Sequence, residues 1–288
     1  MAASNTQPTY KRQRFLLAFI RQLKSGVTST DLQKLVFMYT MKEKSEFYQF
    51  VPYKFGSYSF QLAEDIDILR RDGYLSTEVS RIQAIGDYPH EANFSISNER
   101  GDNLIRKAYR KYPFYAINSE ITNRLFIGDE FDSFKHERQR YVQPNQVLFT
   151  IGYEGKSIEE FINILIVNDI RLLCDVRKNA LSRKFGFSKS KLKHITETVG
   201  IKYIHIPDLG IESNKRSSLE TTVDYQLLFK DYKKALPNYK QQLEYLYSLL
   251  SSNVRIALMC YEKEANMCHR HVIRDSLTDT NSIRSVDI

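Results

Sequence analysis

The first part of the chain carries apolar residues at helical spacing. Over residues 15–23, apolar side chains recur every three or four positions opposite lysines and arginines, which predicts an amphipathic helix. Thr30, followed three residues later by Gln33, is the pattern of a capping box and predicts the start of a second helix. A third helix is predicted to begin after Ser59 and to end at Gly73, because serine favours helix starts and glycine favours helix ends.

Residues 74–97 follow these helices with a looser alternation of apolar and polar positions. Turn signals at Gly86 and Pro89 divide the segment, which predicts a β-hairpin. Three helices and a hairpin are the parts of a winged helix, so residues 1–128 are predicted to be a winged-helix-like domain for targeting or partner binding. Residues 129–146 are highly charged and contain Pro-Asn, so they are predicted to be a linker.

The second half alternates short apolar runs with helical patterns. Ser157 and Glu160 form a further capping box, which predicts a helix after the first run. Short β-branched runs separated by helices predict a mostly parallel sheet with helices on its faces. The runs are residues 147–151, 171–176, 202–206 and 254–259. Residues 147–288 are therefore predicted to be an α/β domain, which places the chain in the α/β class with a helical domain in front.

Reactive side chains follow these runs. Because the carboxyl ends of parallel strands share one edge of a sheet, the side chains are expected to lie together there. Acids, a thiol and an imidazole suit catalysis, and arginines suit anion binding through paired hydrogen bonds. The candidate catalytic residues are Glu154, Asp175, Glu262, Cys268 and His269. The candidate substrate-binding residues are Gly152, Tyr153, Arg177, Ser182, Arg183, Cys260, Tyr261 and Arg270.

Several of these residues allow other interpretations. Asp175 and Arg177 suit a structural ion pair as well as a substrate site. Cys268 and Arg274 fit the Cys-x5-Arg spacing of phosphatases, but the residues between them include no glycine for a loop that wraps an anion. Cys260, Cys268 and the histidine after it are metal-ligand types, yet the seven residues between the cysteines are outside ordinary zinc spacing. No cofactor and no metal are therefore predicted.

The composition indicates which cellular compartment the protein occupies and whether it crosses a membrane. The apolar fraction of 42% is ordinary for a globular protein, and no apolar run approaches the roughly 20 residues that cross a bilayer. The first residues lack the apolar core of a signal peptide. Three cysteines, an odd number, do not make a disulfide framework. We expect a soluble, cytoplasmic protein with reduced cysteines and no membrane partner.

The net charge of +8 favours polyanionic partners such as nucleic acid. The third predicted helix presents carboxylates, including Glu64 and Asp65, that would repel phosphate, so it is not expected to enter a DNA groove. Better candidates for DNA contact are the first predicted helix and the basic stretch with Arg106, Lys107 and Arg110, although a solvated surface explains these basic faces equally well.

Several ordered motifs in the second half are shared with one family. They are Thr150-Ile-Gly-Tyr-Glu-Gly155, Cys174-Asp-Val-Arg177, Phe187-Ser188, the run from Gly200 to Gly210, and Cys260-Tyr-Glu262 with Cys268-His269-Arg270. Through them, residues 147–277 resemble the family catalogued as domain of unknown function 488. The chain departs from the family where Leu181 and Ile211 stand in place of a common proline and glycine. The resemblance implies a domain and its marked residues, and it implies no reaction.

The first half carries the pattern Pro-Tyr-x-x-Gly-x-x-Ser, with Tyr53, Gly56 and Ser59 in its places. Over residues 12–80 it resembles Panacea, or antitoxin-like, domains, which implies neutralisation of a partner or control of DNA. We expect an intracellular enzyme that acts on nucleic acid or a nucleotide by hydrolysis or group transfer. The alternatives are a non-catalytic, antitoxin-like protein that senses a ligand, and a cysteine-dependent transferase of sulfur or phosphate.

Overall fold

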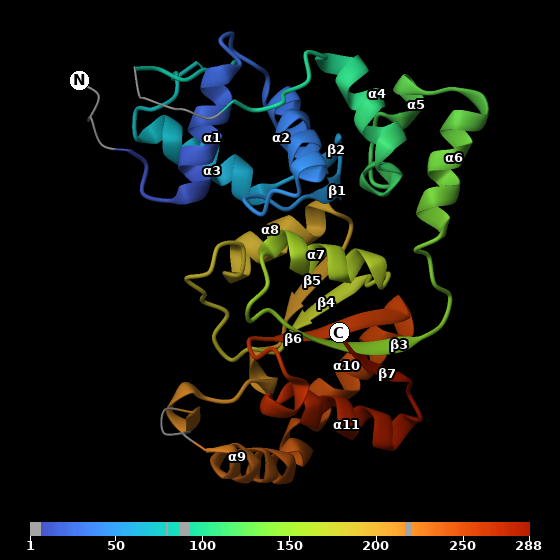
Figure 1. Ribbon diagram of the computed structural model, residues 1–288. Helices are drawn as coiled ribbons and strands as arrows, with labels where there is room; N and C mark the ends of the chain where they lie inside the picture. The colour runs from blue at the N-terminus through green and yellow to red at the C-terminus, as the bar shows by residue number, and fades with distance from the viewer. Residues whose placement is uncertain (1–6, 79, 87–92, 217–220) are drawn as a thin grey trace. The chain divides into compact units, whose positions relative to one another are not determined.

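The structure is a computed structural model that describes residues 7–78, 80–86, 93–216 and 221–288 (Figure 1). The chain divides into two compact units, Met1–Arg140 and Tyr141–Ile288, called unit 1 and unit 2 below. None of the helices in the described ranges has both the length and the apolar character that crossing a membrane requires.

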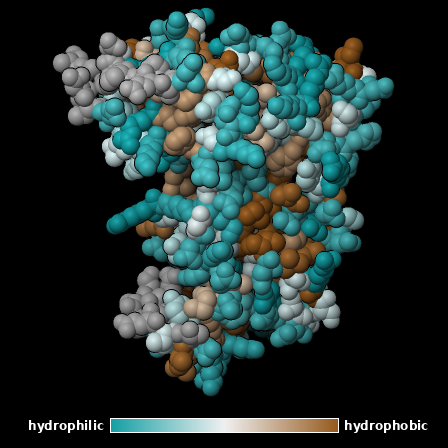
Figure 2. Space-filling model, in the orientation of Figure 1, coloured by the Kyte–Doolittle hydropathy of each residue, from teal (hydrophilic) through white to brown (hydrophobic). Residues whose placement is uncertain are grey.

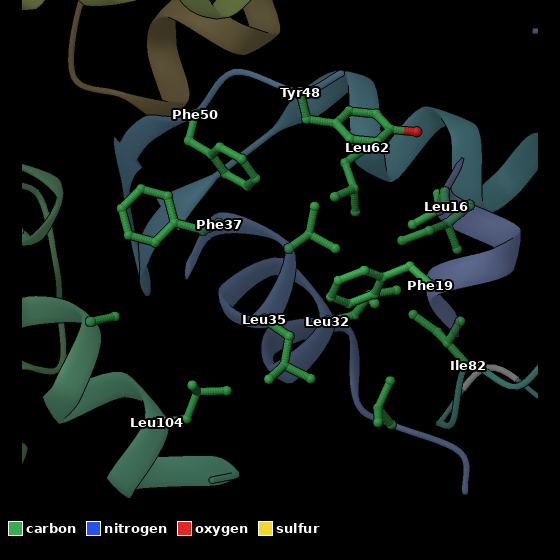
Figure 3. Close-up of a cluster of buried hydrophobic side chains, with 14 of the residues drawn as sticks. Leu16, Phe19, Leu32, Leu35, Phe37, Tyr48, Phe50, Leu62, Ile82 and Leu104 are labelled. Carbon is green, nitrogen blue, oxygen red and sulfur yellow. The ribbon is translucent and has the colours of Figure 1, made fainter. Parts of the chain in front are cut away.

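Unit 1 is mostly helical. Its elements are α1 (Lys11–Gln22), α2 (Ser29–Glu43), β1 (Val51–Tyr53), β2 (Gly56–Tyr58), α3 (Phe60–Arg71), α4 (Gly101–Lys111), the 3-10 turn η1 (Pro113–Ala116), α5 (Thr122–Leu125) and α6 (Gly128–Gln139). The apolar faces of the amphipathic helices meet in one core. Figure 3 shows how Leu16 and Phe19 of α1, Leu32 and Leu35 of α2, and Leu62 of α3 converge there.

The start of α2 differs from the prediction. Thr28 caps the helix, because its hydroxyl accepts a hydrogen bond from the Asp31 N–H at 3.1 Å. Gln33, which was predicted to complete the cap, exchanges hydrogen bonds of 2.8 and 3.0 Å with the backbone of Ser59. The capping box predicted at Thr30 is therefore wrong. Ser59 caps α3 as predicted, since its hydroxyl accepts the N–H of the third residue after it.

Strand pairing in residues 74–97 is sparse. Within the described part of this segment, isolated antiparallel bridges join Leu75 to Ala84 and Ile82 to Val27. The turn predicted between Gly86 and Pro89 falls mainly on residues 87–92, which lie outside the described residues. The regular hairpin of unit 1 is instead β1 with β2, which precedes α3. The winged-helix assignment therefore stays a prediction.

Asp65 of α3 is fully buried, although we expected it on the surface of the helix. Its carboxylate accepts hydrogen bonds from Arg12 at 2.7 Å, from Gln13 at 2.9 Å and from Tyr48 at 2.9 Å. Burial of a carboxylate is favourable only with such partners, so Asp65 links α1 to α3 instead of presenting charge to the solvent.

The predicted linker, residues 129–146, is mostly helical. It contains nearly all of α6, and Phe134 of this helix is buried, with its ring centre 4.8 Å from that of Phe126 and 6.1 Å from that of Tyr109. The charged residues of the segment flank Phe134 and the partly buried Phe131, which both pack on the core of unit 1. The division between the units, after Arg140, lies inside the predicted range, but the helix itself belongs to unit 1.

Unit 2 is a parallel sheet with helices on both faces, as predicted, and it has five strands where the sequence predicted four. Its strands are β3 (Val147–Gly152), β4 (Leu172–Asp175), β5 (Lys202–His205), β6 (Arg255–Cys260) and β7 (Ser285–Asp287). Its helices are α7 (Ile158–Val167), α8 (Lys189–Thr198), α9 (Thr222–Ala235), α10 (Lys240–Asn253) and α11 (Arg270–Asn281), with the 3-10 turns η2 (Pro207–Leu209), η3 (Ser213–Arg216), η4 (Leu236–Tyr239) and η5 (Ala265–Met267). Helices α7 and α8 lie on one face, and α10 and α11 lie on the other (Figure 1).

The strand order, β5-β4-β6-β3-β7, places β6 between two strands that come earlier in the chain. The loops that follow β3 and β4 therefore flank the loop that follows β6. The register pairs Gly152 with Cys260 and Asp175 with Met259, so the three strands end at nearly the same level. This carboxyl edge is the place where an open parallel sheet gathers functional groups.

The surface is mostly hydrophilic in the view of Figure 2. Apolar side chains that are well exposed include Ile127 at 87% and Leu181 at 78%. Single exposed apolar residues are normal, and they do not identify a site.

Candidate functional site

Backbone pairing joins the loops after β3 and β6. The Tyr153 N–H donates to the Cys260 carbonyl at 3.3 Å, and the Glu154 N–H donates to the Tyr261 carbonyl at 2.9 Å. The Lys263 N–H in turn donates to the Glu154 carboxylate at 2.9 Å. The two loops are therefore joined along the carboxyl edge of the sheet. This surface, formed by residues 153–156 and 260–263, is called the ledge.

Gly152 allows this close approach. A Cβ atom built on Gly152 would lie 1.8 Å from the carbonyl oxygen of Glu262, a distance that no side chain tolerates. A glycine at the end of β3 is therefore required by the loop that crosses it, and its role is structural. This contact does not support the prediction that Gly152 binds the substrate.

Arg270 lies beneath the same loop, in the first turn of α11. Only 1% of its surface is exposed. Its Nε donates to the Thr150 hydroxyl at 3.2 Å, while Nη1 and Nη2 donate to the carbonyls of Glu262 and Lys263. The guanidinium thus holds the loop from inside, which favours a structural role over the anion binding predicted from the sequence.

Asp175 and Arg177 form a buried ion pair at the end of β4. The Arg177 Nε and Nη2 donate to the two carboxylate oxygens at 2.8 and 2.6 Å, and 0% and 5% of the two side chains is exposed. Arg177 also donates to the Tyr153 hydroxyl at 3.1 Å and the Phe187 carbonyl at 3.0 Å, and Asp175 accepts from the Tyr203 hydroxyl at 2.7 Å. Burial is the largest single influence on the pKa of Arg177 and acts to lower it, but the hydrogen bonds and charge attraction from Asp175 and Tyr153 together exceed it, so the pKa is raised. The geometry favours the structural ion pair of the two interpretations.

Cys260, Cys268 and His269 meet inside the unit, directly beneath the ledge. The Nδ1 of His269 lies 3.8 Å from the Cys260 Sγ and 3.9 Å from the Cys268 Sγ. The other ring nitrogen, Nε2, lies 3.0 Å from the Val176 carbonyl oxygen. All three side chains are at most 4% exposed. Glu262 lies beside this cluster, on the side of the ledge, with its Oε2 3.4 Å from the Cys260 Sγ.

The phosphatase-like spacing of Cys268 and Arg274 does not correspond to a loop around an anion. Arg274 forms ion pairs with Asp275 and Asp287, and Asp287 lies in β7. Burial raises the pKa of the Cys268 thiol well above its usual range, so the thiol is not an activated nucleophile. These contacts weigh against a cysteine-dependent transferase.

The accessible groups of the ledge are fewer than the sequence suggested. Glu154 and Tyr261 are exposed, whereas Tyr153 is buried with its ring stacked on Phe187 at 4.3 Å. Two lysines that sequence reasoning missed lie beside the ledge, because Lys156 Nζ donates to the Gly152 carbonyl and Lys184 Nζ to the Tyr153 carbonyl, each at 3.0 Å. Their places, Lys156 in the loop after β3 and Lys184 in the loop after β4, were the signal that could have indicated them.

Ser182 and Arg183 lie on the loop between β4 and α8. The Ser182 hydroxyl accepts the N–H of Lys184 at 3.2 Å, and Arg183 is exposed to solvent. Lys184 therefore links this loop to the ledge. Burial lowers the pKa of Lys184, so its amine loses its proton more readily than an exposed lysine does.

The basic face of α4 is largely paired within unit 1. Lys107 pairs with Glu99 at 2.7 Å, and Arg110 pairs with Glu130 at 2.7 Å. The Arg106 Nε donates to a backbone carbonyl at 3.1 Å. These partners compete with phosphate for the same cations, so the face is a weaker DNA-binding candidate than its sequence suggests.

Comparison with known proteins identifies one part of the chain. Residues 157–277 match the family model described as Domain of unknown function DUF488. No curated protein and no solved structure gave a significant match. The matched segment runs from the start of α7 to most of α11 and includes the cluster of Cys260, Cys268 and His269. It does not extend to residues 12–80, so the resemblance of that part to Panacea domains stays a prediction.

Leu181 and Ile211, the two positions that depart from the family pattern, differ from each other in burial. Leu181 is exposed, whereas Ile211 is 5% exposed and packs in the apolar cluster under α9 and α10. Gly210, directly before it, has no space for a side chain because a Cβ atom would lie 2.1 Å from the Lys178 backbone nitrogen. Gly210 is thus required by packing, and the apolar side chain of Ile211 adds to the core.

Proposed function

We propose that unit 2 is an enzyme that acts on a nucleic acid or a nucleotide at the carboxyl edge of its sheet. The observation that carries the proposal is the place where two acidic loops meet. There the Lys263 N–H donates to the Glu154 carboxylate at 2.9 Å, and Glu262, the residue before Lys263, brings a second carboxylate. Lys156 and Lys184 lie along the same ledge. Carboxylates suit proton transfer and ammonium groups suit phosphate, so this edge offers both parts of phosphate chemistry.

The two carboxylates have different surroundings, which suits two different roles. Glu154 is exposed, whereas Glu262 is half-buried with its Oε2 3.4 Å from the Cys260 Sγ. In the proposed reaction one carboxylate accepts the proton of the attacking hydroxyl or water, and the other acid protonates the leaving oxygen. The lysines stabilise negative charge that develops on the phosphate oxygens.

Tyr261 supplies a surface for a base. Its ring is 45% exposed, and it packs edge-on against Tyr153 with 5.2 Å between the ring centres. Every nucleobase presents a flat face, so an exposed ring at the ledge binds bases with little dependence on sequence. Tyr261 is thus the aromatic side chain that meets the substrate, whereas Tyr153, predicted from the sequence to bind it, is buried.

Arg177 and Arg270 support this proposal from inside. Arg177 fixes the Tyr153 hydroxyl at 3.1 Å, and Arg270 fixes the carbonyl of Lys263 at 2.8 Å. A catalytic edge needs loops held in place before the substrate binds. Both arginines are positioning residues in this scheme, and neither contacts the substrate.

The test is a survey of substrates with the full-length protein. Single-stranded and duplex DNA, RNA and nucleoside triphosphates are incubated with it, and products are followed by denaturing gels and mass spectrometry. We expect turnover of one class, and a loss of about 10²-fold or more in Glu262→Gln, the scale of general acid–base catalysis. Glu264→Gln is the matched control, because Glu264 is an exposed acid on the same loop.

Two outcomes would reject the proposal. One is the absence of both turnover and low-salt binding with every substrate class, since phosphate contacts should weaken steeply as salt is added. The other is equal activity in Glu262→Gln and Glu264→Gln. Saturable binding without turnover would instead favour the non-catalytic, ligand-sensing alternative.

A further inference from the structure

We propose that Cys260, Cys268 and His269 form a binding site for a thiophilic divalent cation of the zinc class. The two Sγ atoms and a ring nitrogen all lie within 4.8 Å of one another. This inference concerns metal binding alone, and it does not depend on the proposed function.

The spacing of the donor atoms fits a tetrahedral ion. Zinc binds sulfur at about 2.3 Å and imidazole nitrogen at about 2.0–2.1 Å, which puts neighbouring donors roughly 3.5–3.8 Å apart. The Nδ1 of His269 lies 3.8 Å from the Cys260 Sγ and 3.9 Å from the Cys268 Sγ. The imidazole nitrogen therefore lies within a few tenths of an ångström of the separation that it would have from each sulfur on a zinc ion, and the two sulfur atoms lie within 4.8 Å of each other.

The orientation of His269 is that of a metal ligand. Its Nε2 lies 3.0 Å from the carbonyl oxygen of Val176. A carbonyl can only accept a hydrogen bond, so Nε2 carries a proton, and in the neutral ring the lone pair of Nδ1 then points toward the two sulfur atoms. A backbone carbonyl that fixes the remote nitrogen is a common second partner of ligating histidines, because it sets both the tautomer and the ring angle.

The three donors come from two firmly held segments. Cys260 ends the buried strand β6, and the other two residues directly precede α11. Arg270 brings these segments together, because it follows His269 in the chain and donates to the carbonyls of Glu262 and Lys263. The site is thus closed by a strand end and a helix start, so the short cysteine spacing of zinc ribbons is not required.

Glu262 marks the open side of the cluster. Its Oε2 lies 3.4 Å from the Cys260 Sγ, close to the separation of two ligands on one zinc ion. Three protein donors with one further position leave room for this carboxylate or a water molecule. We therefore place the fourth ligand on the Glu262 side, toward the ledge.

The rival explanation is a redox pair. Two thiols whose sulfur atoms lie within 4.8 Å of each other are also arranged for a disulfide. Thiolates bind metal and thiols form the disulfide only after oxidation, so the two states exclude each other. Metal content and the oxidation state of the cysteines separate them.

The experiment starts with metal analysis of the full-length protein, purified with a reductant and without chelator. We expect one zinc ion per chain, held by the three protein donors and one further ligand. Protein stripped of metal and titrated with Co²⁺ should develop thiolate-to-cobalt charge-transfer bands and the visible bands of tetrahedral cobalt. This titration uses the unmodified chain, so it does not rely on any variant folding normally.

Variants then locate the ion. Cys268→Ser and His269→Ala should lose the metal, whereas Cys174→Ala should keep it, because Cys174 is equally buried but lies in β4 outside the cluster. The proposal is overturned if stripped protein gives no cobalt–thiolate bands, or if the cluster variants retain the metal of the wild type. A metal-free protein with a Cys260–Cys268 disulfide, found by peptide mass spectrometry, would establish the redox pair instead.

Discussion

The substitution Asp175→Asn tests whether the carboxyl edge rests on a buried ion pair. The carboxylate accepts hydrogen bonds from the Arg177 N–H, Nε and Nη2 and from the Tyr203 hydroxyl, all between 2.6 and 3.1 Å. Asparagine keeps the shape but removes the charge, and it leaves the guanidinium buried without a counter-ion. Breaking a buried pair from one side costs about 3–5 kcal/mol, so we expect a loss of this size in the free energy of unfolding. That is a large share of the roughly 5–15 kcal/mol that stabilises an ordinary domain.

The assay must report on unit 2 alone, because two units can unfold in separate steps. The chain has no tryptophan, so Tyr247→Trp on the exposed side of α10 provides a single fluorescent reporter in unit 2. Urea unfolding is then compared in this background with and without Asp175→Asn. Asp208→Asn is the matched control, since Asp208 is an exposed aspartate in the loop after β5, and it should change stability by less than about 0.5 kcal/mol.

A loss below about 1 kcal/mol in Asp175→Asn, the scale of a single ordinary hydrogen bond, would refute the reasoning. Arg177 would then not depend on Asp175, and its assignment to substrate binding would regain weight. The double substitution Asp175→Leu with Arg177→Met gives a second check. Replacing both partners of a buried pair by apolar residues is often nearly neutral, so the double variant should be more stable than Asp175→Asn.

Three further predictions concern other parts of the chain. Gly152→Ala should lower the free energy of unfolding by about 1–3 kcal/mol, and the melting temperature with it, because the added Cβ meets the Glu262 carbonyl. An unchanged melting temperature would contradict the close approach. Arg270→Lys should also lower the melting temperature, because one ammonium nitrogen does not replace the three separate nitrogens of the planar guanidinium, each of which reaches a different acceptor. Full stability with weakened substrate binding would restore the anion-binding role. Burial lowers the pKa of Lys34 to about 7 from 10.5, so the folded form releases a proton that the unfolded chain keeps. The stability of unit 1 should therefore rise from pH 7 to pH 10, and Lys34→Met should flatten this rise in calorimetric melting; an equal slope in both proteins would reject the shift.

Local sequence patterns predicted most of the elements of unit 2. The four long strands and the helices between them were predicted because each apolar run is bounded by capping residues or glycine, which are local signals. β7 was missed because a three-residue strand at the edge of the sheet, Ser285–Asp287, carries no periodicity. The start of α2 was misplaced for a related reason, since both Thr28 and Thr30 suit a cap and only the packing of Gln33 against Ser59 separates them.

The sequence also predicted that the loops after the strands meet, because parallel strands bring their carboxyl ends to one edge. It did not determine which side chains there face the solvent. Arg177 and Arg270 carry charge, which usually indicates exposure, yet each is buried among acceptors that come from distant positions, such as the Phe187 carbonyl and the Thr150 hydroxyl. The burial of a charge depends on the sum of such partners, and no local pattern records them.

The meeting of Cys260, Cys268 and His269 was decided by the tertiary structure alone. Spacing along the chain argued against a metal site, because a short loop normally sets the ligand geometry. Here the geometry comes from the end of β6, the start of α11 and the Val176 carbonyl after β4, which fixes the imidazole. Local sequence determines whether a segment is a strand or a helix, but the distance between two such segments follows from how the whole sheet packs.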